Sequence, residues 1–399
     1  MEKRFILRDE SFGYTLFDKA RLRYKFLAKT DSKTEFRFPD ITAEDFEKWS
    51  LDLSAAPKEI IYSPIRVYFE LTSSCPLQCR VCFNSSGKTK SDEMSTEEVR
   101  KTLNGLRKDG VLDVRFSGGE PTTKPDWFEL LKYSKDLGFA VSLNTNGVYA
   151  NPEETINKLI NLDLEQITLS IDGGRDFHNY IRGDGNYEKT AETLEKLSEG
   201  RANLRINTVL TKGSAKDLEK VLDLAGKFVS EINFFYMRLT GRALGILDQV
   251  MSYEELHQFD EKIEALKPNY PHLRILHGSK VMVANSISPD IKNNVGLKMG
   301  GPDGFTRFNL LPDGSIWPGG YTPYLRPDFK LGYIQNESYS LLDIWRNSPK
   351  LNEFREISLR LQKDCLACPE KNIKCPGASM EMEFYRKNSK DKKNPCCAY

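Results

Sequence analysis

Short apolar segments alternate with longer amphipathic segments through the middle of the chain. Segments rich in β-branched and aromatic residues predict six strands, at 65–70, 113–117, 140–145, 166–171, 203–210 and 231–239. Stretches with helical periodicity predict six helices, at 96–108, 127–137, 153–162, 187–199, 215–228 and 253–265. Such alternation is typical of an α/β fold with a parallel sheet and crossover helices. Ligand sites of such folds lie at the carboxyl ends of the strands.

The two flanks of the chain have a different pattern. Before the alternating region, three short strands at 4–8, 14–18 and 21–27 and a helix at 42–53 predict a small N-terminal α+β unit, followed by a linker at 55–58. After it, residues 305–311 and 315–317 flank Pro312-Asp313-Gly314, which predicts a hairpin, and a helix starts at 340–345. We therefore expect three domains, at 1–62, 63–295 and 296–399.

Composition excludes several classes of protein. The 399 residues carry 58 Lys and Arg against 57 Asp and Glu, so the chain has no electrostatic footprint for nucleic acid or membrane. No run of about 18 apolar residues predicts a membrane span, and the first residues lack the apolar core of a signal peptide. We expect a cytoplasmic protein, in which cysteines stay reduced.

The cysteines form two groups at opposite ends of a cysteine-free body. They are Cys75, Cys79, Cys82, Cys365, Cys368, Cys375, Cys396 and Cys397. This distribution is typical of metal sites and not of a disulfide framework. The first three lie on a loop that leaves the strand at 65–70. A zinc site would need a fourth ligand, and the nearest histidine is His178, whereas an iron–sulfur cluster tolerates three thiolates and leaves one iron open.

The C-x3-C-x2-C spacing of Cys75, Cys79 and Cys82 resembles the signature loop of the radical S-adenosylmethionine (radical SAM) superfamily. The resemblance implies a partial (β/α)6 TIM barrel and a [4Fe-4S] cluster whose open iron binds S-adenosylmethionine (SAM). It also implies further SAM-binding residues at the next strand ends. These are Gly118, Gly119 and Glu120 of a GGEP motif, Asn146 of a TNG turn, Ser170 and Arg182 of the following segment, and Asn207. Any one of these turns alone would be ordinary turn chemistry.

The C-terminal region resembles the SPASM extension of radical SAM enzymes, which normally holds two auxiliary clusters. The resemblance is partial. Positions where the family usually has cysteine hold Gly319 or Gly320 after the hairpin turn and Ser379 near the end, and residues 296–304 contain none. The remaining Cys365, Cys368, Cys375 and one of Cys396 and Cys397 imply one auxiliary [4Fe-4S] cluster. On ligand type alone the same four thiolates also fit a zinc ribbon.

The resemblance implies an activity. An electron from a flavodoxin- or ferredoxin-like donor drives reductive cleavage of SAM, and the resulting 5′-deoxyadenosyl radical removes a hydrogen from the substrate. SPASM-type enzymes mostly modify peptides, and residues 1–62 weakly resemble a peptide-recognition domain. We therefore expect a ribosomally made precursor peptide as substrate, with leader recognition by this unit or by a separate protein.

Three alternatives stay open at this stage. The substrate could be a small molecule in cofactor or metabolite biosynthesis. The chain could instead be a zinc-ribbon binding protein without radical chemistry. Residues 1–62 could also simply cap the barrel. The sequence identifies no catalytic acid or base.

Overall fold

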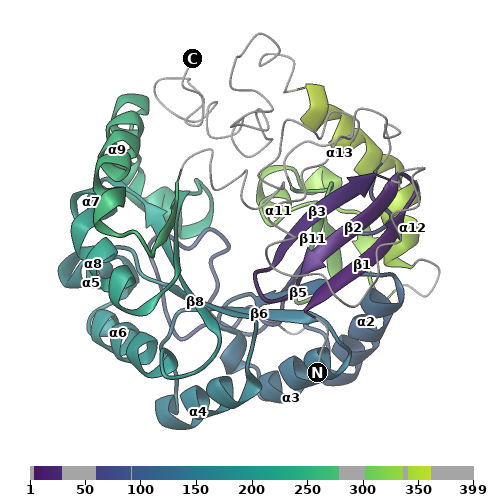
Figure 1. Cartoon of the computed structure of the whole chain (residues 1–399), viewed down its shortest axis with the longest axis horizontal. Coiled ribbons are helices and arrows are strands. Elements are labelled where there is room, and N and C mark those ends of the chain that lie inside the picture. Colours follow the sequence, from purple (N-terminus) through teal and green to yellow (C-terminus); the bar gives the residue numbers. More distant parts are fainter. Residues whose placement is uncertain (1–3, 29–59, 91, 278–301, 336–339, 361–399) are drawn as a thin grey trace.

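A computed structural model describes residues 4–28, 60–90, 92–277, 302–335 and 340–360. Its core is one sheet in which seven parallel strands follow one another in chain order (Figure 1). These strands are β4 Arg66–Glu70, β5 Asp113–Ser117, β6 Ala140–Thr145, β7 Gln166–Ser170, β8 Asn203–Leu210, β9 Glu231–Tyr236 and β10 Arg274–Leu276. The expected α/β partial barrel is therefore confirmed. The predicted sixth strand ends earlier than 239, and the short β10 extends the sheet beyond it.

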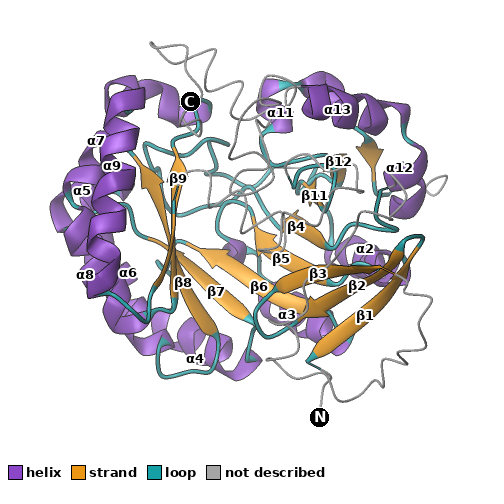
Figure 2. Cartoon of the chain, turned by 45° about the horizontal axis from the view of Figure 1, so that its top comes forward, coloured by secondary structure: helices purple, strands orange, loops and turns teal. Residues whose placement is uncertain are grey.

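Helices cover the outer face of the curved sheet (Figure 2). They are α2 Thr96–Lys108, α3 Trp127–Asp136, α4 Pro152–Leu162, α5 Arg175–Arg182, α6 Asn186–Leu197, α7 Lys212–Lys216, α8 Leu218–Phe228 and α9 Tyr253–Leu266. The predicted helix at 215–228 is two helices, α7 and α8, which meet at Asp217 because its backbone leaves helical values there. Helix α5 was not predicted. Short 3-10 helices lie at Pro121–Thr123, Gly241–Gln249, Lys267–Asn269 and Pro327–Phe329.

Strand residues alternate between the helix layer and the barrel interior. Val67 and Phe69 are fully buried in the core, and the Phe69 ring stacks on Phe116 of the next strand. Tyr68, between them, points to the opposite face, because successive side chains of a strand alternate. The polar interior that results is unusual, since strands of a parallel sheet are normally apolar on both faces. It marks the side of the sheet that faces the functional site.

The N-terminal unit is a separate antiparallel sheet of β1 Phe5–Glu10, β2 Gly13–Asp18 and β3 Arg23–Ala28. It packs on the amino ends of the barrel strands. The Ala20 carbonyl accepts a bond from Asn203, the first residue of β8, and the Leu22 carbonyl accepts one from Arg66, the first residue of β4. The three predicted strands are confirmed within two or three residues, while the predicted helix at 42–53 and linker at 55–58 lie outside the described residues.

The C-terminal region is hydrogen-bonded into the barrel sheet. Strand β11 Arg307–Leu310 runs parallel to β4, and β12 Ser315–Trp317 and β13 Gly332–Tyr333 continue the sheet in antiparallel order. The predicted hairpin is thus confirmed. Helix α11 Thr322–Leu325 lies between β12 and β13, and α12 Leu341–Asn347 and α13 Pro349–Arg360 follow β13. Within the described ranges, every helix is too short or too polar to span a bilayer.

Candidate active site

The loop after β4 carries Cys75, Cys79 and Cys82 and is closed by its own backbone. Cys75 N donates to the Gly87 carbonyl at 2.8 Å, and Gly87 N donates to the Ser73 carbonyl at 3.0 Å. These bonds tie the two ends of the loop together at the carboxyl end of β4. The predicted position of the loop, at the strand ends, is therefore the observed one.

All three loop cysteines are free thiols that line one cavity. Cys79 is buried and the other two are half-buried. Burial raises the pKa of Cys75 to about 11 and also raises that of Cys79, for which Arg182 acts in the opposite direction. Within the described ranges, no three His, Cys, Asp or Glu side chains gather around one point suited to a single metal ion. Thiolates of a cubane cluster each bind their own iron atom, so cluster ligands do not need to meet at one point.

The turn after β5 packs directly against the start of the cysteine loop. Gly119 N donates to the Thr72 carbonyl and Glu120 N donates to the Ser74 carbonyl, both at 2.7 Å. A Cβ atom on Gly119 would lie 2.0 Å from the Ser74 oxygen, so only glycine fits there. Gly118 and Gly119 line the cavity. Glycine thus lets this turn approach the backbone of the cysteine loop closely.

Glu120 has an internal role in the structure. Its side chain is fully buried and accepts bonds from the Thr145 hydroxyl at 2.9 Å and from Asn146 N at 2.8 Å. It is not among the residues that line the cavity. Burial raises its pKa, and these hydrogen bonds oppose the increase. The predicted contact between Glu120 and the SAM amino group stays a prediction; the observed contacts hold the turn after β6 against the turn after β5.

Asn146 lies beside the first cysteine. Its Nδ2 is 3.7 Å from the Cys75 sulfur, and its Oδ1 accepts a bond from Val148 N at 2.7 Å. The Thr190 hydroxyl of α6 donates to the Asn146 carbonyl, which anchors the turn from behind. The structure therefore brings Asn146 and the cysteine loop together, as the sequence predicted.

Arg182 approaches the second cysteine from α5. Its Nη1 is 3.9 Å from the Cys79 sulfur, and its Nε donates to Asp172 Oδ2 at 2.7 Å. The second carboxylate oxygen of Asp172 accepts Val209 N at 2.8 Å, so the ion pair is fixed to β8. Asp172 is 1% exposed, so the guanidinium has a buried counter-charge and a set direction.

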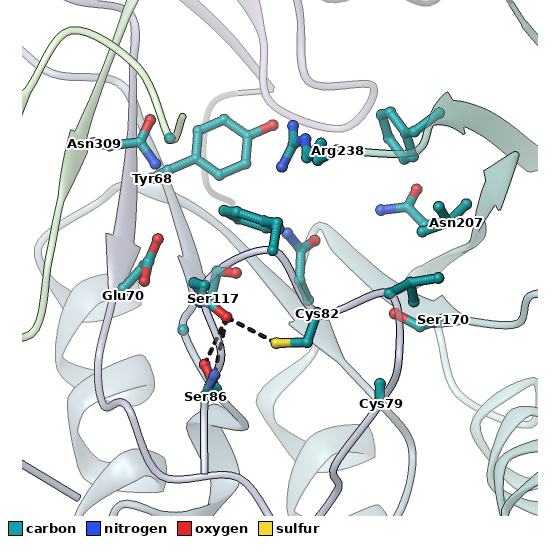
Figure 3. A pocket seen from close by; sticks show the side chains of 18 of the residues that line it. Tyr68, Glu70, Cys79, Cys82, Ser86, Ser117, Ser170, Asn207, Arg238 and Asn309 are labelled. Atoms are coloured by element: carbon teal, nitrogen blue, oxygen red, sulfur yellow. Dashed lines mark hydrogen bonds between the residues drawn. The ribbon is translucent and has the colours of Figure 1, made fainter. Parts of the chain in front are cut away.

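Ser170, Asn207 and Asn233 form a polar row across the strand ends of β7, β8 and β9. Ser170 is in register with Asn207, and Asn207 with Asn233. All three line the cavity, and Figure 3 shows Ser170 and Asn207 on the side of the hollow opposite Tyr68 and Glu70. Asn144 Oδ1 and Asn233 Oδ1 are buried and have no hydrogen-bond partner among the described residues. Such orphaned acceptors suit a ligand rich in N–H and O–H donors, as SAM is.

The cavity holds about 350 Å³, within the usual range for small-molecule sites. Of the residues predicted from the sequence, it is lined by Cys75, Cys79, Cys82, Gly118, Gly119, Asn146, Ser170, Arg182 and Asn207. The predicted ligands Cys365, Cys368, Cys375, Cys396 and Cys397 lie outside the described residues. The donor set that is described therefore fits a cluster with bound SAM.

Sequence reasoning missed several other residues that line the cavity. They are Tyr68, Glu70, Arg205, Asn233, Arg238, Arg242 and Arg307. Burial opposes ionisation of Tyr68, yet the guanidinium groups of Arg115, Arg307 and Arg66 lower its pKa to about 7. The pKa of Glu70 is raised by burial to about 7. A charged residue inside a parallel strand, such as Arg115 or Arg205, was the available signal, because such strands are normally apolar.

Comparison with known proteins agrees with this geometry. Residues 69–225 match the family described as the radical SAM superfamily, and residues 302–369 match the iron–sulfur cluster-binding domain named SPASM. A mycofactocin maturase, MftC, of Mycobacterium ulcerans is 28% identical over 84% of this chain and 88% of its own length. An AdoMet-dependent heme synthase of Methanosarcina barkeri is 29% identical over 79% of this chain and 91% of its own length.

A solved structure has a similar fold over almost the whole chain. Streptococcus suis SuiB bound to the precursor peptide SuiA aligns with a TM-score of 0.73 and 18% identity, covering 99% of this chain and 98% of that chain. Fold and site together therefore define a class of protein: a barrel with a cysteine loop of the iron–sulfur type at its strand ends. The chain belongs to the radical SAM superfamily and carries a SPASM domain, which binds auxiliary iron–sulfur clusters.

Proposed function

We propose that the protein is a radical SAM enzyme that modifies a ribosomally synthesised precursor peptide, with Cys75, Cys79 and Cys82 as ligands of the catalytic [4Fe-4S] cluster. The observation that carries this proposal is the position of the three free thiols in one cavity with Arg182 and the polar row Ser170, Asn207 and Asn233. When bound, the cluster and SAM supply a 5′-deoxyadenosyl radical that removes a hydrogen atom from the substrate.

The residues of the chain then have separate tasks around SAM. Arg182, fixed by Asp172, offers a guanidinium to the SAM carboxylate, and Gly118 and Gly119 let SAM approach the backbone. The side-chain amides of Asn207 and Asn233 offer acceptors and donors for the nucleoside. These contacts hold the reacting carbon in one place, which is the main contribution of protein to such a reaction.

Proton transfer, where the reaction needs it, has two candidates in the same cavity. Glu70 and Tyr68 both line it, and the pKa of each is about 7, so each can exchange a proton near neutral pH. Glu70 lies at the end of β4 and Tyr68 two residues earlier on the same face.

One auxiliary cluster is the number that the cysteines support. Four thiolates from Cys365, Cys368, Cys375 and one of Cys396 and Cys397 complete a single cubane, and the positions of the other auxiliary site hold no cysteine. A flavodoxin- or ferredoxin-like protein is the expected electron donor.

The peptide substrate is supported by relatives and not by the N-terminal unit. MftC is named as a maturase. The SuiB structure contains a bound precursor peptide. The sheet β1–β3 packs on the amino ends of the barrel strands, at the opposite end from the cysteine loop. A peptide that paired with this sheet would have to cross roughly the length of a strand, about 20 Å, to reach the cavity. Capping of the barrel is therefore an equally good role for the unit.

A small-molecule substrate is the second candidate, because the heme synthase relative is as similar to this chain as MftC. An experiment on the full-length protein distinguishes a peptide substrate from a small-molecule substrate. We expect a precursor peptide encoded beside the gene to bind the anaerobically reconstituted protein and to gain or lose mass when SAM and reductant are added. Turnover of a tetrapyrrole with an unchanged peptide would decide for the small molecule.

The cluster assignment has a direct test. Anaerobically reconstituted protein should contain about eight iron atoms per chain, for two clusters. Under dithionite it should form 5′-deoxyadenosine from SAM, and the Cys75→Ala variant should not. Zinc without iron, or 5′-deoxyadenosine at the wild-type rate from Cys75→Ala, would refute the proposal. About twelve iron atoms would point to auxiliary ligands other than cysteine.

A further inference from the structure

The segment that follows β9 clamps the cysteine loop through hydrogen bonds to its backbone carbonyls. Arg242 N donates to the Cys82 carbonyl at 2.9 Å, Arg242 Nε donates to the Cys79 carbonyl at 2.9 Å, and Arg242 Nη1 donates to the Ser86 carbonyl at 2.8 Å. The Thr240 hydroxyl adds a bond to the Phe83 carbonyl at 3.0 Å. One arginine thus contacts the backbone of two predicted cluster ligands.

The clamp depends on a glycine between these two residues. Gly241 has φ +58, and a Cβ atom there would lie 2.5 Å from the Phe83 oxygen and 2.6 Å from the Cys82 oxygen. The backbone of the segment can therefore approach the loop only with glycine at this position. The sequence pattern gave no sign of this contact, because residues 240–242 lie about 160 positions from the loop.

One nitrogen of the Arg242 guanidinium has no hydrogen-bond partner among the described residues. This nitrogen, Nη2, is buried. Arg242 also lines the cavity together with Cys79 and Cys82. A buried guanidinium N–H without an acceptor costs free energy, so the arrangement is favourable only if a ligand of the cavity supplies the acceptor.

We propose that Arg242 is a positioning residue for the iron–sulfur cluster: it fixes the cysteine loop through three carbonyls and donates an N–H of its Nη2 to a sulfur atom of the bound cluster. This inference rests on the cluster site proposed above. Arginine keeps its charge at any working pH, and hydrogen bonds and net charge at the sulfurs tune the reduction potential of such clusters. A fixed positive charge stabilises the reduced cluster more than the oxidised one, so Arg242 makes the cluster easier to reduce.

The test compares three variants of the full reconstituted protein. Arg242→Gln removes the charge and the two side-chain bonds of the clamp. Arg242→Lys keeps the charge but not the forked geometry. Arg80→Gln removes an equal charge from an exposed position of the same loop. The midpoint potential is measured by redox titration of the EPR signal that changes when SAM is added, together with iron content and the rate of iron loss to a chelator.

We expect Arg242→Gln to shift the midpoint potential to more negative values and Arg80→Gln to leave it unchanged. Arg242→Lys should keep a potential closer to the wild type but lose iron to the chelator roughly tenfold faster than Arg80→Gln, because two hydrogen bonds to the loop are gone. Loss of cluster loading in Arg242→Gln, with normal loading in Arg80→Gln, also supports the clamp.

Two results would overturn the inference. One is an Arg242→Gln variant that loads normally and has the potential of Arg80→Gln. The other is an Arg242→Lys variant with wild-type potential and wild-type resistance to the chelator. Both would leave the proposed function intact. Wild-type protein without any SAM-dependent EPR change would instead refute the proposed cluster site, and the inference with it.

Discussion

The Glu120 carboxylate accepts the main-chain N–H of Asn146 at 2.8 Å and so joins the turns that follow β5 and β6. Both turns lie on the cavity wall beside the cysteine loop, because Gly118, Gly119 and Asn146 line the same space as Cys75. A single buried carboxylate therefore sets the spacing of two backbone segments that we expect to contact SAM.

Replacing Glu120 should weaken SAM binding through this spacing. We expect Glu120→Ala to raise the SAM dissociation constant about tenfold or more and to lower thermal stability, because a buried N–H left unpaired costs about 1–3 kcal/mol. Glu120→Gln keeps one acceptor oxygen, so its SAM affinity and thermal stability should lie between those of the wild type and Glu120→Ala. Equilibrium dialysis with labelled SAM and thermal melting measure both effects. The exposed Glu129→Ala is the control, and a Glu120→Ala variant equal to it in both assays would contradict the expected role.

Asp172 should be as important for SAM binding as Arg182, with which it forms an ion pair. Asp172→Asn keeps the shape and the bond to Val209 N but leaves the Arg182 guanidinium without its buried counter-charge, a change that typically costs 3–5 kcal/mol when one partner of such a pair is removed. We expect lower stability and SAM binding weakened by at least about tenfold. Asp176→Asn, at an exposed position of α5, the helix that carries Arg182, should behave like the wild type. Unchanged SAM affinity in Asp172→Asn would show that Arg182 does not need this orientation.

His178 should make stability depend on pH. Its Nδ1 accepts Asp172 N at 3.3 Å, and burial together with the nearby Arg182 lowers its pKa from 6.5 to about 4. Below pH 6.5 His178 is protonated in the unfolded chain but stays neutral in the folded protein. The contribution of His178 to the free energy of unfolding is therefore complete above pH 6.5 and decreases toward pH 4, by about 1.4 kcal/mol per pH unit.

Urea unfolding between pH 8 and pH 5.5 tests this dependence. The wild-type free energy of unfolding should fall more steeply with decreasing pH than that of His178→Gln, which has no titrating group at this position. His272→Gln, at an exposed histidine, should keep the wild-type slope. Parallel curves for the wild type and His178→Gln would mean that His178 does not contribute to the acid sensitivity.

Trp345 should anchor the C-terminal region on the barrel. It is fully buried, its ring packs edge-on against Phe308 at 4.8 Å, and its Nε1 donates to the Ile61 carbonyl at 2.8 Å. We expect Trp345→Ala to lower the free energy of unfolding by about 3–5 kcal/mol and Trp345→Phe by about 1–2 kcal/mol, since phenylalanine keeps the ring but loses the hydrogen bond. Chemical denaturation measures both. Equal losses in the two variants would assign the effect to the hydrogen bond instead of the packing.

The sequence predicted the residues that act locally and missed those that act across the fold. Six strands and the helix at 96–108 were predicted from local composition and periodicity, and in the structure a capping box of Ser95 and Glu98 fixes the start of α2. The loop cysteines and the turns at Gly118 and Asn146 were predictable because each is a short motif at a strand end.

Other features depend on contacts between distant segments, which no local pattern encodes. The bond from Arg242 to the Cys79 carbonyl joins residues 163 positions apart. The bond from Asn146 N to the Glu120 carboxylate joins the turns that follow two neighbouring strands. The break at Asp217 lies in a segment with continuous helical periodicity, so its pattern predicts one helix where the structure has two.

The pairing of β11 with β4 has a consequence for synthesis of the chain. The strand that leads into the cysteine loop gains its second neighbour only when Arg307 emerges, about 240 residues after Arg66, and contacts so distant in sequence form late. Until then β4 is an open edge of the growing sheet, ready to pair with other strands. The cysteine loop therefore stays next to an unfinished sheet edge until the C-terminal region has been made, so a late segment completes the support of an early motif.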